Sequence, residues 1–348
     1  MKHVLVIRLS ALGDVAIMVP VLRGYAASNA QVTFTVAGPP MLAPLFEGMG
    51  NVHFLGLKKK QSFLKIYKAL EAVGADTVVD LHKVNRVGMA LVLMRLRHLF
   101  FSGFHIYSLR KGRFSRWMFL HHWCRRPRKP QYVRYDDVFR RAGLNGGERL
   151  KQKGEKTDAS TDTHLSPCTP HPTPLIGVAP FSQHEGKVWP WENVELLVQM
   201  LSDKGFRVLL FGSKNEAPKL ESLASKQAIV SSVAGKQSFA EELQIIKGLS
   251  LMVSMDSANM HFASALGIPV VSIWGATHPD FGFYGYGQNR DDALCANLPC
   301  QPCSAYGQKA CRYGDYRCLK AITPEMVLEL ILKKLGIQAF KHSSNQAF

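Results

Sequence analysis

Short apolar runs alternate with amphipathic stretches through the first eighty residues. Residues 2–8, with the apolar run 4–7 at their centre, indicate a short buried strand, and Val15, Met18, Val19 and Leu22 then recur at helical spacing. The same pattern predicts strands at 31–37, 51–57 and 77–81, with a further helix from Ser62. Strands that alternate with helices are typical of a parallel sheet covered on both faces.

The pattern stops at 151–174 and then begins again. This stretch (KQKGEKTDASTDTHLSPCTPHPTP) is polar, rich in proline and without apolar periodicity, so we expect an interdomain linker or loop. Beyond it, strands are predicted at 175–179, 207–211, 229–233, 251–255 and 270–274, and helices at 191–204, from 216, at 239–247 and at 258–266. We therefore expect two α/β domains, 1–172 and 173–348, with ligands held in a cleft at the carboxyl ends of the strands.

Composition agrees with this organisation. A chain of 348 residues suits two domains of ~100–200 residues each, and 47% hydrophobic with 20% charged residues excludes a disordered or collagen-like protein. No apolar run approaches the ~18 residues needed to span a bilayer. Arg8 and Asp14 interrupt the apolar N-terminal segment before a secretory signal core can form. A cytoplasmic protein is the expectation.

The formal net charge is +17, and most of the excess comes from one window. Between Leu81 and Tyr135 there is no Asp or Glu. The thirteen cations of this basic window are Lys83, Arg86, Arg95, Arg97, Arg110, Lys111, Arg113, Arg116, Arg125, Arg126, Arg128, Lys129 and Arg134. Such a region is expected to face an anionic partner, and nucleic acid, anionic lipid and a phosphorylated substrate are the candidates.

One loop that can carry chemistry lies between the first strand and the first helix. In residues 10–14 (SALGD) the glycine permits a sharp turn, and the carboxylate of Asp14 can point from the helix start into the cleft. The alternative is that Asp14 only caps the helix. The loop matches neither a Walker A sequence nor GxGxxG, so it supports neither an ordinary P-loop nor a dinucleotide fingerprint.

Two loops of the second half suit a phosphate. Residues 255–261 (MDSANMH) follow an apolar strand, and their small side chains expose backbone N–H groups at a positive helix end. Asp256 or Ser257 can instead be a simple cap, and His261 a surface histidine. In residues 181–190 (FSQHEGKVWP) Lys187 accompanies a hydroxyl, and a compact ammonium suits a departing anion; the alternative is a solvated lysine.

Together these segments resemble the ADP-heptose:lipopolysaccharide heptosyltransferases, glycosyltransferase family 9. The similarity rests on VLVIRLSALGDV followed by Pro20, SQHEGKVWP, FGSKNE, VAGKQSF and MDSANMHFASALGIPVVSIWGATHP, in family order from Val4 to Pro279. In the last and most specific segment, Asp-Ser, a histidine five residues after the aspartate and a Gly-Ala-Thr-His-Pro exit occur together. The resemblance implies an α/β protein of two facing Rossmann-like domains with a central cleft, a glycosyltransferase B-type fold. Its N-terminal domain would bind the acceptor and its C-terminal domain the nucleotide sugar.

The resemblance also implies an inverting, metal-independent transfer of heptose from ADP-heptose to a lipopolysaccharide inner-core or lipid A acceptor, with no cofactor. Carried over by position, Asp14 is the expected general base. The expected donor ligands are Ser182 and Lys187 at the diphosphate, Asp256, Ser257, Ala258 and His261 around the diphosphate and sugar, Glu216 at the ribose and Gln237 at the adenine.

The basic window then matches a phosphorylated acceptor and the anionic surface of the inner membrane, so we expect a peripheral protein on the cytoplasmic face. The acceptor ligands expected here are Arg110, Lys111, Arg113 and Arg116. Aromatic residues suited to lipid contact are interleaved with the cations: Phe100, Phe101, Phe104, Tyr107, Phe114, Trp117, Phe119 and Trp123. One alternative is that the aromatic residues belong to the core and the charges form a solvated face. The other is RNA binding, although we do not expect a nucleic-acid partner.

Five of the seven cysteines fall within residues 295–318. Among them, Cys300 and Cys303 form a CxxC pair that suits zinc, whereas Cys311 and Cys318 are spaced too widely for a common zinc ribbon. A disulfide cluster does not suit a reducing cytoplasm. Free or partly paired thiols are expected rather than structural zinc.

Two other functions stay open. One is a glycosyltransferase of the same fold with a different nucleotide sugar. The other is a basic lipid-binding or nucleic-acid-binding protein whose transferase site has decayed, against which the presence of Asp14, Lys187 and Asp256 argues.

Overall fold

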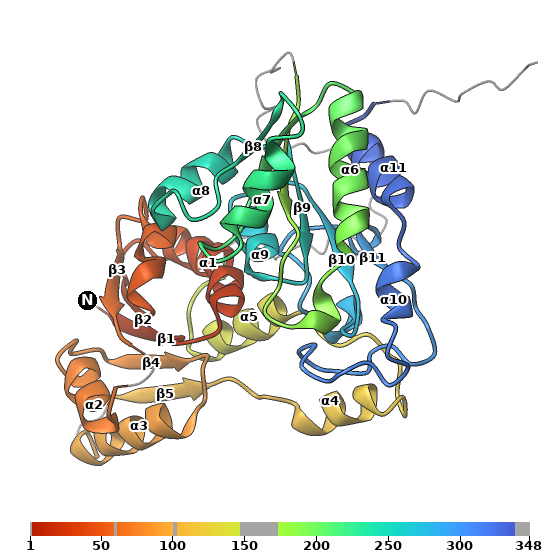
Figure 1. Ribbon diagram of the computed structural model, residues 1–348. Helices are drawn as coiled ribbons and strands as arrows, with labels where there is room; N and C mark the ends of the chain where they lie inside the picture. Colours follow the sequence, from red (N-terminus) through yellow and green to blue (C-terminus); the bar gives the residue numbers. More distant parts are fainter. Residues whose placement is uncertain (1, 59–60, 100–102, 147–172, 338–348) are drawn as a thin grey trace, which may run out of the picture.

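The computed structural model describes residues 2–58, 61–99, 103–146 and 173–337. Its N-terminal half holds a parallel sheet in the order β3-β2-β1-β4-β5 (Figure 1). The strands are β1 (His3–Ile7), β2 (Thr33–Gly38), β3 (Val52–Gly56), β4 (Thr77–Asp80) and β5 (His105–Ser108). The helices are α1 (Leu12–Ser28), η1 (Pro40–Phe46), α2 (Phe63–Glu71), α3 (Asn85–Arg97), α4 (Arg113–Leu120) and α5 (Gln131–Arg141).

The C-terminal half holds a second parallel sheet, in the order β11-β10-β9-β6-β7-β8. Its strands are β6 (Leu175–Ala179), β7 (Arg207–Leu210), β8 (Val230–Ser232), β9 (Leu251–Met255), β10 (Val270–Trp274) and β11 (Ala293–Cys295). The helices are η2 (Glu185–Lys187), α6 (Trp191–Asp203), α7 (Ala217–Ala224), α8 (Phe239–Lys247), α9 (Ala258–Ala265), η3 (Pro279–Phe281), η4 (Arg290–Asp292), α10 (Arg317–Lys320) and α11 (Pro324–Lys334).

The two halves repeat one topology. In each sheet the first strand lies centrally, the next two strands extend to one side, and the fourth pairs with the first on the other side. The strand order therefore reverses between β1 and β4 and again between β6 and β9, and loops at such a point form the usual ligand crevice of an open α/β sheet. This arrangement confirms the α/β class and the two Rossmann-like lobes expected from the sequence.

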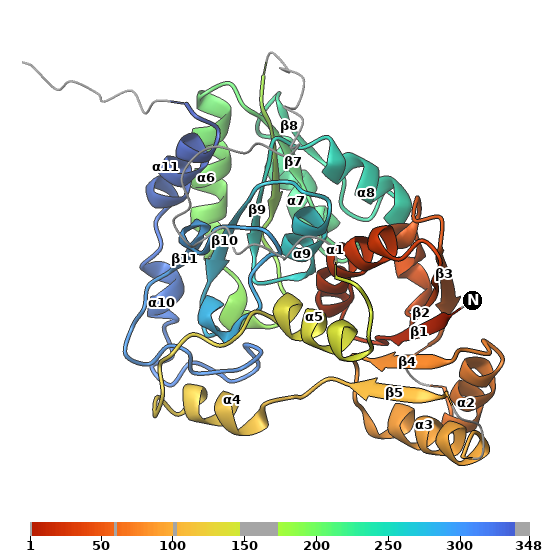
Figure 2. The same ribbon diagram turned by 180° about the vertical axis from the view of Figure 1, so that it is seen from behind.

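The two lobes contact each other through α1 and α9, which pack side by side. One hydrophobic cluster continues across this contact, from Val15 and Met18 of α1 to Met260 and Phe262 of α9. A second junction lies before α5, where Gly282 accepts a hydrogen bond from the Gln131 backbone N–H at 2.7 Å. Figure 2 shows α5 beside α1, below the second sheet. Both junctions bring the carboxyl ends of the two sheets together.

Every helix and strand expected from the sequence is present, with ends that differ by at most two residues. Nothing was predicted between residues 82 and 146, where the structure forms α3, β5, α4 and α5. Most of the expected linker at 151–174 lies outside the described residues, and the domain boundary at 172 stays a prediction.

Candidate active site

Asp14 lies in the first turn of α1, directly after the central strand β1. Its Oδ2 forms an ion pair with Nη2 of Arg8, and its Oδ1 accepts a hydrogen bond from the Tyr135 hydroxyl at 3.4 Å. The N-cap of the helix is Ala11, whose backbone N–H donates to Oδ2 of Asp14 at 3.4 Å. Asp14 thus supports the helix start, but its side chain remains 20% exposed, so a hydroxyl can reach the carboxylate.

Two residues that hold Asp14 were not found from the sequence. Arg8 is buried, donates from Nη1 to the Leu81 carbonyl and lies 5.8 Å from the centre of the Tyr135 ring. Burial, and then the nearby Asp14 carboxylate, raises the pKa of Tyr135, so this residue remains a hydrogen-bond donor at neutral pH. Tyr135 is 121 positions from Asp14, and only the fold brings the two together.

Lys187 and Asp256 form the centre of the C-terminal cluster. Nζ of Lys187 lies 3.0 Å from Oδ2 of Asp256 and 3.1 Å from the Asp256 carbonyl oxygen, with the side chains 15% and 11% exposed. The Ser182 hydroxyl donates to the same carbonyl at 3.2 Å, and the Thr277 hydroxyl donates to Oδ2 at 2.8 Å. The structure therefore joins Ser182 and Lys187 to Asp256, and Lys187 is no solvated loop lysine. Thr277, from the Gly-Ala-Thr-His-Pro segment, is a further member.

The start of α9 follows directly after this cluster. Ser257 is its N-cap, without a side-chain cap bond, and its Oγ lies 3.1 Å from Oγ of Ser254. Ser257 thus occupies the cap position expected as one alternative but makes no capping side-chain bond, whereas the Asp256 carboxylate bonds Lys187 and Thr277 and is no cap. Ala258 is the first residue of α9, and its methyl group leaves the positive helix end open to an anion.

His261 lies where the two lobes meet. A Cβ atom at Gly13 would overlap Cδ2 of His261, so the glycine lets the start of α1 approach α9. His261 is buried, and burial lowers its pKa to about 4 against the opposing effects of Asp256 and Asp14; Lys187 lowers it further. The ring is therefore neutral at pH 7 and interacts with charges from both lobes. The alternative of a surface histidine is wrong.

Glu216 and Gln237 lie on neighbouring loops at the carboxyl ends of β7 and β8. Oε2 of Glu216 accepts hydrogen bonds from the backbone N–H of Ser213 at 2.6 Å and from its hydroxyl at 2.8 Å. Gln237 is exposed, two residues after Gly235, where a Cβ would lie 2.6 Å from Cα of Lys214. The two loops are thus in contact, but their roles at the ribose and adenine stay predictions.

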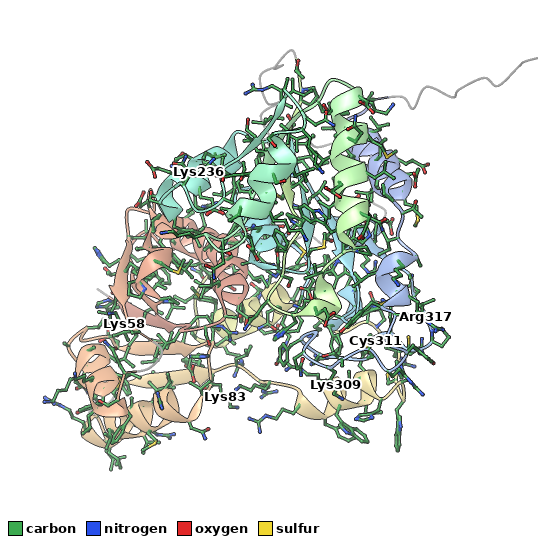
Figure 3. All side chains as sticks on the ribbon, viewed as in Figure 1. Lys58, Lys83, Lys236, Lys309, Cys311 and Arg317 are labelled. Carbon is green, nitrogen blue, oxygen red and sulfur yellow. The ribbon has the colours of Figure 1, made fainter. Side chains whose placement is uncertain are left out.

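The four cations expected at the acceptor are divided among three places. Lys111 and Arg113 line a cavity of about 630 Å³ between α3 and the start of α4, near Lys83 (Figure 3). Arg110 lines a second cavity of about 710 Å³ between α4 and α5. Nη1 of Arg116 donates to the Tyr306 hydroxyl at 2.5 Å. Their acceptor role stays a prediction.

The aromatic residues of the basic window include both exposed and buried side chains. Phe114, Trp117 and Trp123 are 71%, 43% and 73% exposed. Phe119 is buried, with its ring centre 4.9 Å from that of Phe281, so its expected lipid contact is wrong. Phe100 and Phe101 lie outside the described residues.

The cysteine-rich segment covers the Lys187 loop. The Ala276 carbonyl accepts hydrogen bonds from the backbone N–H groups of Cys303 and Ser304, both at 3.1 Å. Gly307 adopts φ +82°, and a Cβ there would lie 2.7 Å from Cγ of Lys187. Lys309 and Cys311 continue this segment above α4 (Figure 3).

Cys300, Cys303, Cys311 and Cys318 are free cysteines, and burial raises the pKa of Cys318 to about 12. In the part of the chain that the structure describes, no group of three or more His, Cys, Asp or Glu is arranged to hold a metal ion. The role of these thiols stays a prediction.

Comparisons with known proteins identify the family and the fold of this chain. The sequence profile of glycosyltransferase family 9 (heptosyltransferase) matches residues 63–314, which include Lys187 and Asp256 but not Asp14. Lipopolysaccharide heptosyltransferase 2 of Salmonella typhimurium is 33% identical over 135 residues, 37% of this chain and 38% of that protein. The alignment thus spans little more than a third of this relative.

Two solved structures share the fold over nearly the whole chain. ADP-heptose lipopolysaccharide heptosyltransferase II of E. coli has a TM-score of 0.66 at 21% identity, covering 96% of this chain and 98% of that one. An E. coli heptosyltransferase solved with ADP has a TM-score of 0.64 at 17% identity, covering 96% and 100%. The fold is the two-lobed glycosyltransferase B type. With a profile match over most of its length, the chain belongs to glycosyltransferase family 9, the heptosyltransferase family.

Proposed function

We propose that this protein transfers heptose from ADP-heptose to a phosphorylated lipopolysaccharide inner-core acceptor, with inversion at the anomeric carbon and without a metal ion. Family membership and the names of the relatives support the donor and the acceptor class. One observation carries the proposal. His261 of α9 packs against Gly13, the residue before Asp14, and α9 itself begins directly after Asp256 and its partner Lys187, so the proposed base and the proposed anion-binding cluster border one place.

Asp14 is the proposed general base. The acceptor hydroxyl attacks the anomeric carbon on the face opposite the diphosphate, and its proton passes to the carboxylate as the new C–O bond forms. The ion pair with Arg8 fixes the carboxylate, and Tyr135 donates to its other oxygen. A positioned base of this kind contributes typically ~10²–10⁴ in rate.

The C-terminal cluster would stabilise the departing ADP. As the bond from the anomeric carbon to the diphosphate oxygen breaks, the electron pair stays on that oxygen. The Lys187 ammonium and the N–H groups at the start of α9 supply fixed positive charge there. Asp256 acts as a positioning residue because its carboxylate pairs with Lys187, and Thr277 donates to that carboxylate. Glu216 and Gln237 are proposed for the nucleoside.

A transfer assay tests this function. The protein is incubated with ADP-heptose and a heptose-free lipopolysaccharide acceptor, and mass spectrometry follows the acceptor. Addition of one heptose, in the inverted anomeric configuration by NMR, is the expected result. Transfer from a UDP- or GDP-sugar in place of ADP-heptose would contradict the proposed donor. Absence of transfer, with tight binding to RNA or lipid, would favour a decayed site instead.

We also propose that α3 and α4 place the enzyme on the cytoplasmic face of an anionic membrane. Met89, Val92 and Leu96 of α3 recur at helical spacing and are 49%, 58% and 58% exposed, and Leu99, just beyond the helix, is 62% exposed. Helices α3 and α4 lie at the same lower edge in both views (Figures 1 and 2). An apolar and aromatic face within a basic window suits a lipid headgroup region. Among the described residues, no helix is long and apolar enough to cross a bilayer.

Vesicle sedimentation tests the membrane proposal. A Val92→Asp/Leu96→Asp variant should lose most of its binding to phosphatidylglycerol vesicles. The matched control is Leu196→Asp, because Leu196 is 46% exposed on α6, away from α3 and α4. Equal loss of binding in both variants would contradict the assignment of this face.

A further inference from the structure

Helix α4 belongs to the N-terminal half of the chain, but it packs against the C-terminal lobe. Phe119 is buried, with its ring centre 4.9 Å from that of Phe281 and 6.0 Å from that of His278. Between α4 and α5, the backbone N–H of Arg128 donates to the Asp280 carbonyl at 2.9 Å. Both views show α4 directly below the blue C-terminal segment and away from α2 and α3 (Figures 1 and 2). The helix is therefore docked on the lobe that holds the proposed donor cluster.

Arg116 of this helix contacts two aromatic rings of the C-terminal lobe. Its Cζ lies 5.9 Å from the centre of the Phe283 ring and 5.7 Å from that of the Tyr306 ring. Nη1 donates to the Tyr306 hydroxyl at 2.5 Å, whereas Nε is buried without a hydrogen-bond partner among the residues described. A planar guanidinium stacks on aromatic faces and keeps its charge, so this contact has a defined geometry. Arg116 thus fixes one lobe to the other at Tyr306.

Tyr306 belongs to a turn, residues 303–307, that is fastened to the loop after β10. The backbone N–H groups of Cys303 and Ser304 both donate to the Ala276 carbonyl, as described above. Ser304 is fully buried, and its Oγ accepts a hydrogen bond from the backbone N–H of Gly307 at 3.0 Å. These bonds close the turn on itself and hold it on the C-terminal lobe. A displacement of Tyr306 is therefore a displacement of the whole turn.

The next residue of the turn covers Lys187. A Cβ at Gly307 would lie 2.7 Å from Cγ and 3.1 Å from Cε of Lys187, and a Cβ at Gly186 would lie 3.0 Å from the Gly307 carbonyl oxygen. A lysine side chain has several rotatable bonds, so a surface that covers its stem limits the positions that its ammonium can take. Arg116 of one lobe and Lys187 of the other thus contact consecutive residues of a single turn.

We propose that Arg116 and Tyr306 form a clamp between the lobes that positions Lys187 for the donor diphosphate. The clamp rests on the proposed function for the role of Lys187, and it assigns Arg116, which the sequence places at the acceptor, to the donor side. Both clamp residues are positioning residues, because they act on the donor through Gly307 and Lys187. Loss of the clamp should therefore weaken donor binding and leave the acceptor KM unchanged. With saturating donor kcat should be retained, because the bound diphosphate then holds the ammonium itself.

Calorimetric titration with ADP-heptose, together with transfer kinetics, tests the clamp. The variants are Arg116→Gln and Tyr306→Phe, and each should weaken donor binding about 5–30-fold, within the usual range of coupling between separate sites. The same segment offers a matched pair of controls, Arg312→Gln and Tyr313→Phe. Cζ of Arg312 lies 5.1 Å from the centre of the Tyr313 ring, and Tyr313 is 48% exposed against 50% for Tyr306. Both control variants should bind ADP-heptose like the wild type.

The double variant Arg116→Gln/Tyr306→Phe shows whether the two side chains act as one contact. Its donor affinity should equal that of Arg116→Gln, because both substitutions remove the same hydrogen bond. Additive losses in the double variant would overturn the clamp, and so would an equal loss of donor affinity in the two controls. A raised acceptor KM with unchanged donor affinity in Arg116→Gln would also overturn it, because the arginine would then act on the acceptor.

Hydrogen exchange of the protein without ligand keeps the test independent of the donor. Backbone amides of the turn 303–307 and of η2, which contains Lys187, should exchange about 5–30-fold faster in Arg116→Gln than in the wild type and in Arg312→Gln. If ADP-heptose does not bind the wild type while exchange rises in both segments, the proposed function is wrong and the clamp stands. Unchanged exchange in either segment overturns the clamp.

Discussion

Lys187 of the C-terminal lobe and three arginines of the N-terminal lobe have opposite electrostatic surroundings. In the C-terminal lobe, Lys187 is paired with the Asp256 carboxylate, which Thr277 also contacts. In the N-terminal lobe, Arg116, Arg128 and Arg134 have only neutral hydrogen-bond partners within the described residues. A paired cluster is organised before its ligand arrives, whereas an unpaired one is stabilised by the ligand itself. The comparison therefore predicts that the donor side is preformed and that the acceptor side gains stability on binding.

The largest expected effect separates the two sides. Asp14→Asn should lower kcat by about 10²–10⁴, because the base is lost, while donor affinity is retained. The variant also leaves the buried Arg8 without its partner, so kcat should be compared per folded protein. Asp203→Asn on α6 is the matched control and should keep full activity. Unchanged turnover in Asp14→Asn would remove this residue from the mechanism.

The next largest expected effect concerns the contribution of the Lys187–Asp256 ion pair to stability and to donor binding. Lys187→Met leaves the nearly buried Asp256 carboxylate unpaired and should lower the free energy of unfolding by about 3–5 kcal/mol. The double variant Lys187→Met/Asp256→Asn should recover most of this stability in urea unfolding, but not donor binding. If the double variant binds ADP-heptose like the wild type, Lys187 is not the diphosphate cation.

His261 tests the junction between the two sides. Its folded pKa of about 4 is below the unfolded value of 6.5, so the unfolded chain binds more protons between these pH values. The contribution of His261 to the free energy of unfolding is fully present above pH 6.5 and is lost as the pH falls toward 4. Between pH 7 and 5 the loss due to His261 should be about 2 kcal/mol. The difference in unfolding free energy between wild type and His261→Gln isolates it, and an equal pH dependence in both proteins would contradict the buried neutral ring.

The smallest effect tests the cover over the donor cluster. Gly307→Ala and the control Gly314→Ala both place a methyl group on a left-handed backbone, at φ +82° and +74°. Each substitution should therefore lower the free energy of unfolding by about 1–2 kcal/mol. Only the first presses against the Lys187 stem, since a Cβ at Gly314 has no neighbour within 4 Å among the described residues. A donor KM raised about tenfold in Gly307→Ala alone, or about 1.4 kcal/mol, is expected. Equal donor KM values would show that the cysteine-rich segment does not position Lys187.

Local sequence patterns predicted the parts of the fold whose burial follows a simple period. The strands β1, β4, β9 and β10 lie almost wholly in the core, so continuous apolar runs identify them. Helix α3 differs, because Val87 and Leu91 face the core while Met89, Val92 and Leu96 are exposed. A helix that is apolar on both faces has no clear periodicity, and this is why α3 was not predicted.

Three predicted site residues, Asp14, Lys187 and Asp256, lie at the two points where strand order reverses, on loops with recognisable small and polar residues. The residues that were missed act through distant contacts. Tyr135 reaches Asp14 across 121 positions, and Gly307 reaches Lys187 only because the C-terminal segment folds back over β10. Similarly, Arg116, Arg128 and Arg134 have equally basic neighbours in the sequence, so composition alone cannot distinguish them from solvated arginines.

Calorimetric titration of nucleotide sugars tests the central claim most directly, namely that the Lys187–Asp256 cluster and the start of α9 hold the diphosphate of ADP-heptose. ADP-heptose should bind the wild type and Asp14→Asn with equal affinity and should bind Lys187→Met far more weakly, whereas UDP- and GDP-sugars should give no binding heat. Undiminished ADP-heptose binding by Lys187→Met, or equal binding of a UDP-sugar by the wild type, would contradict the account.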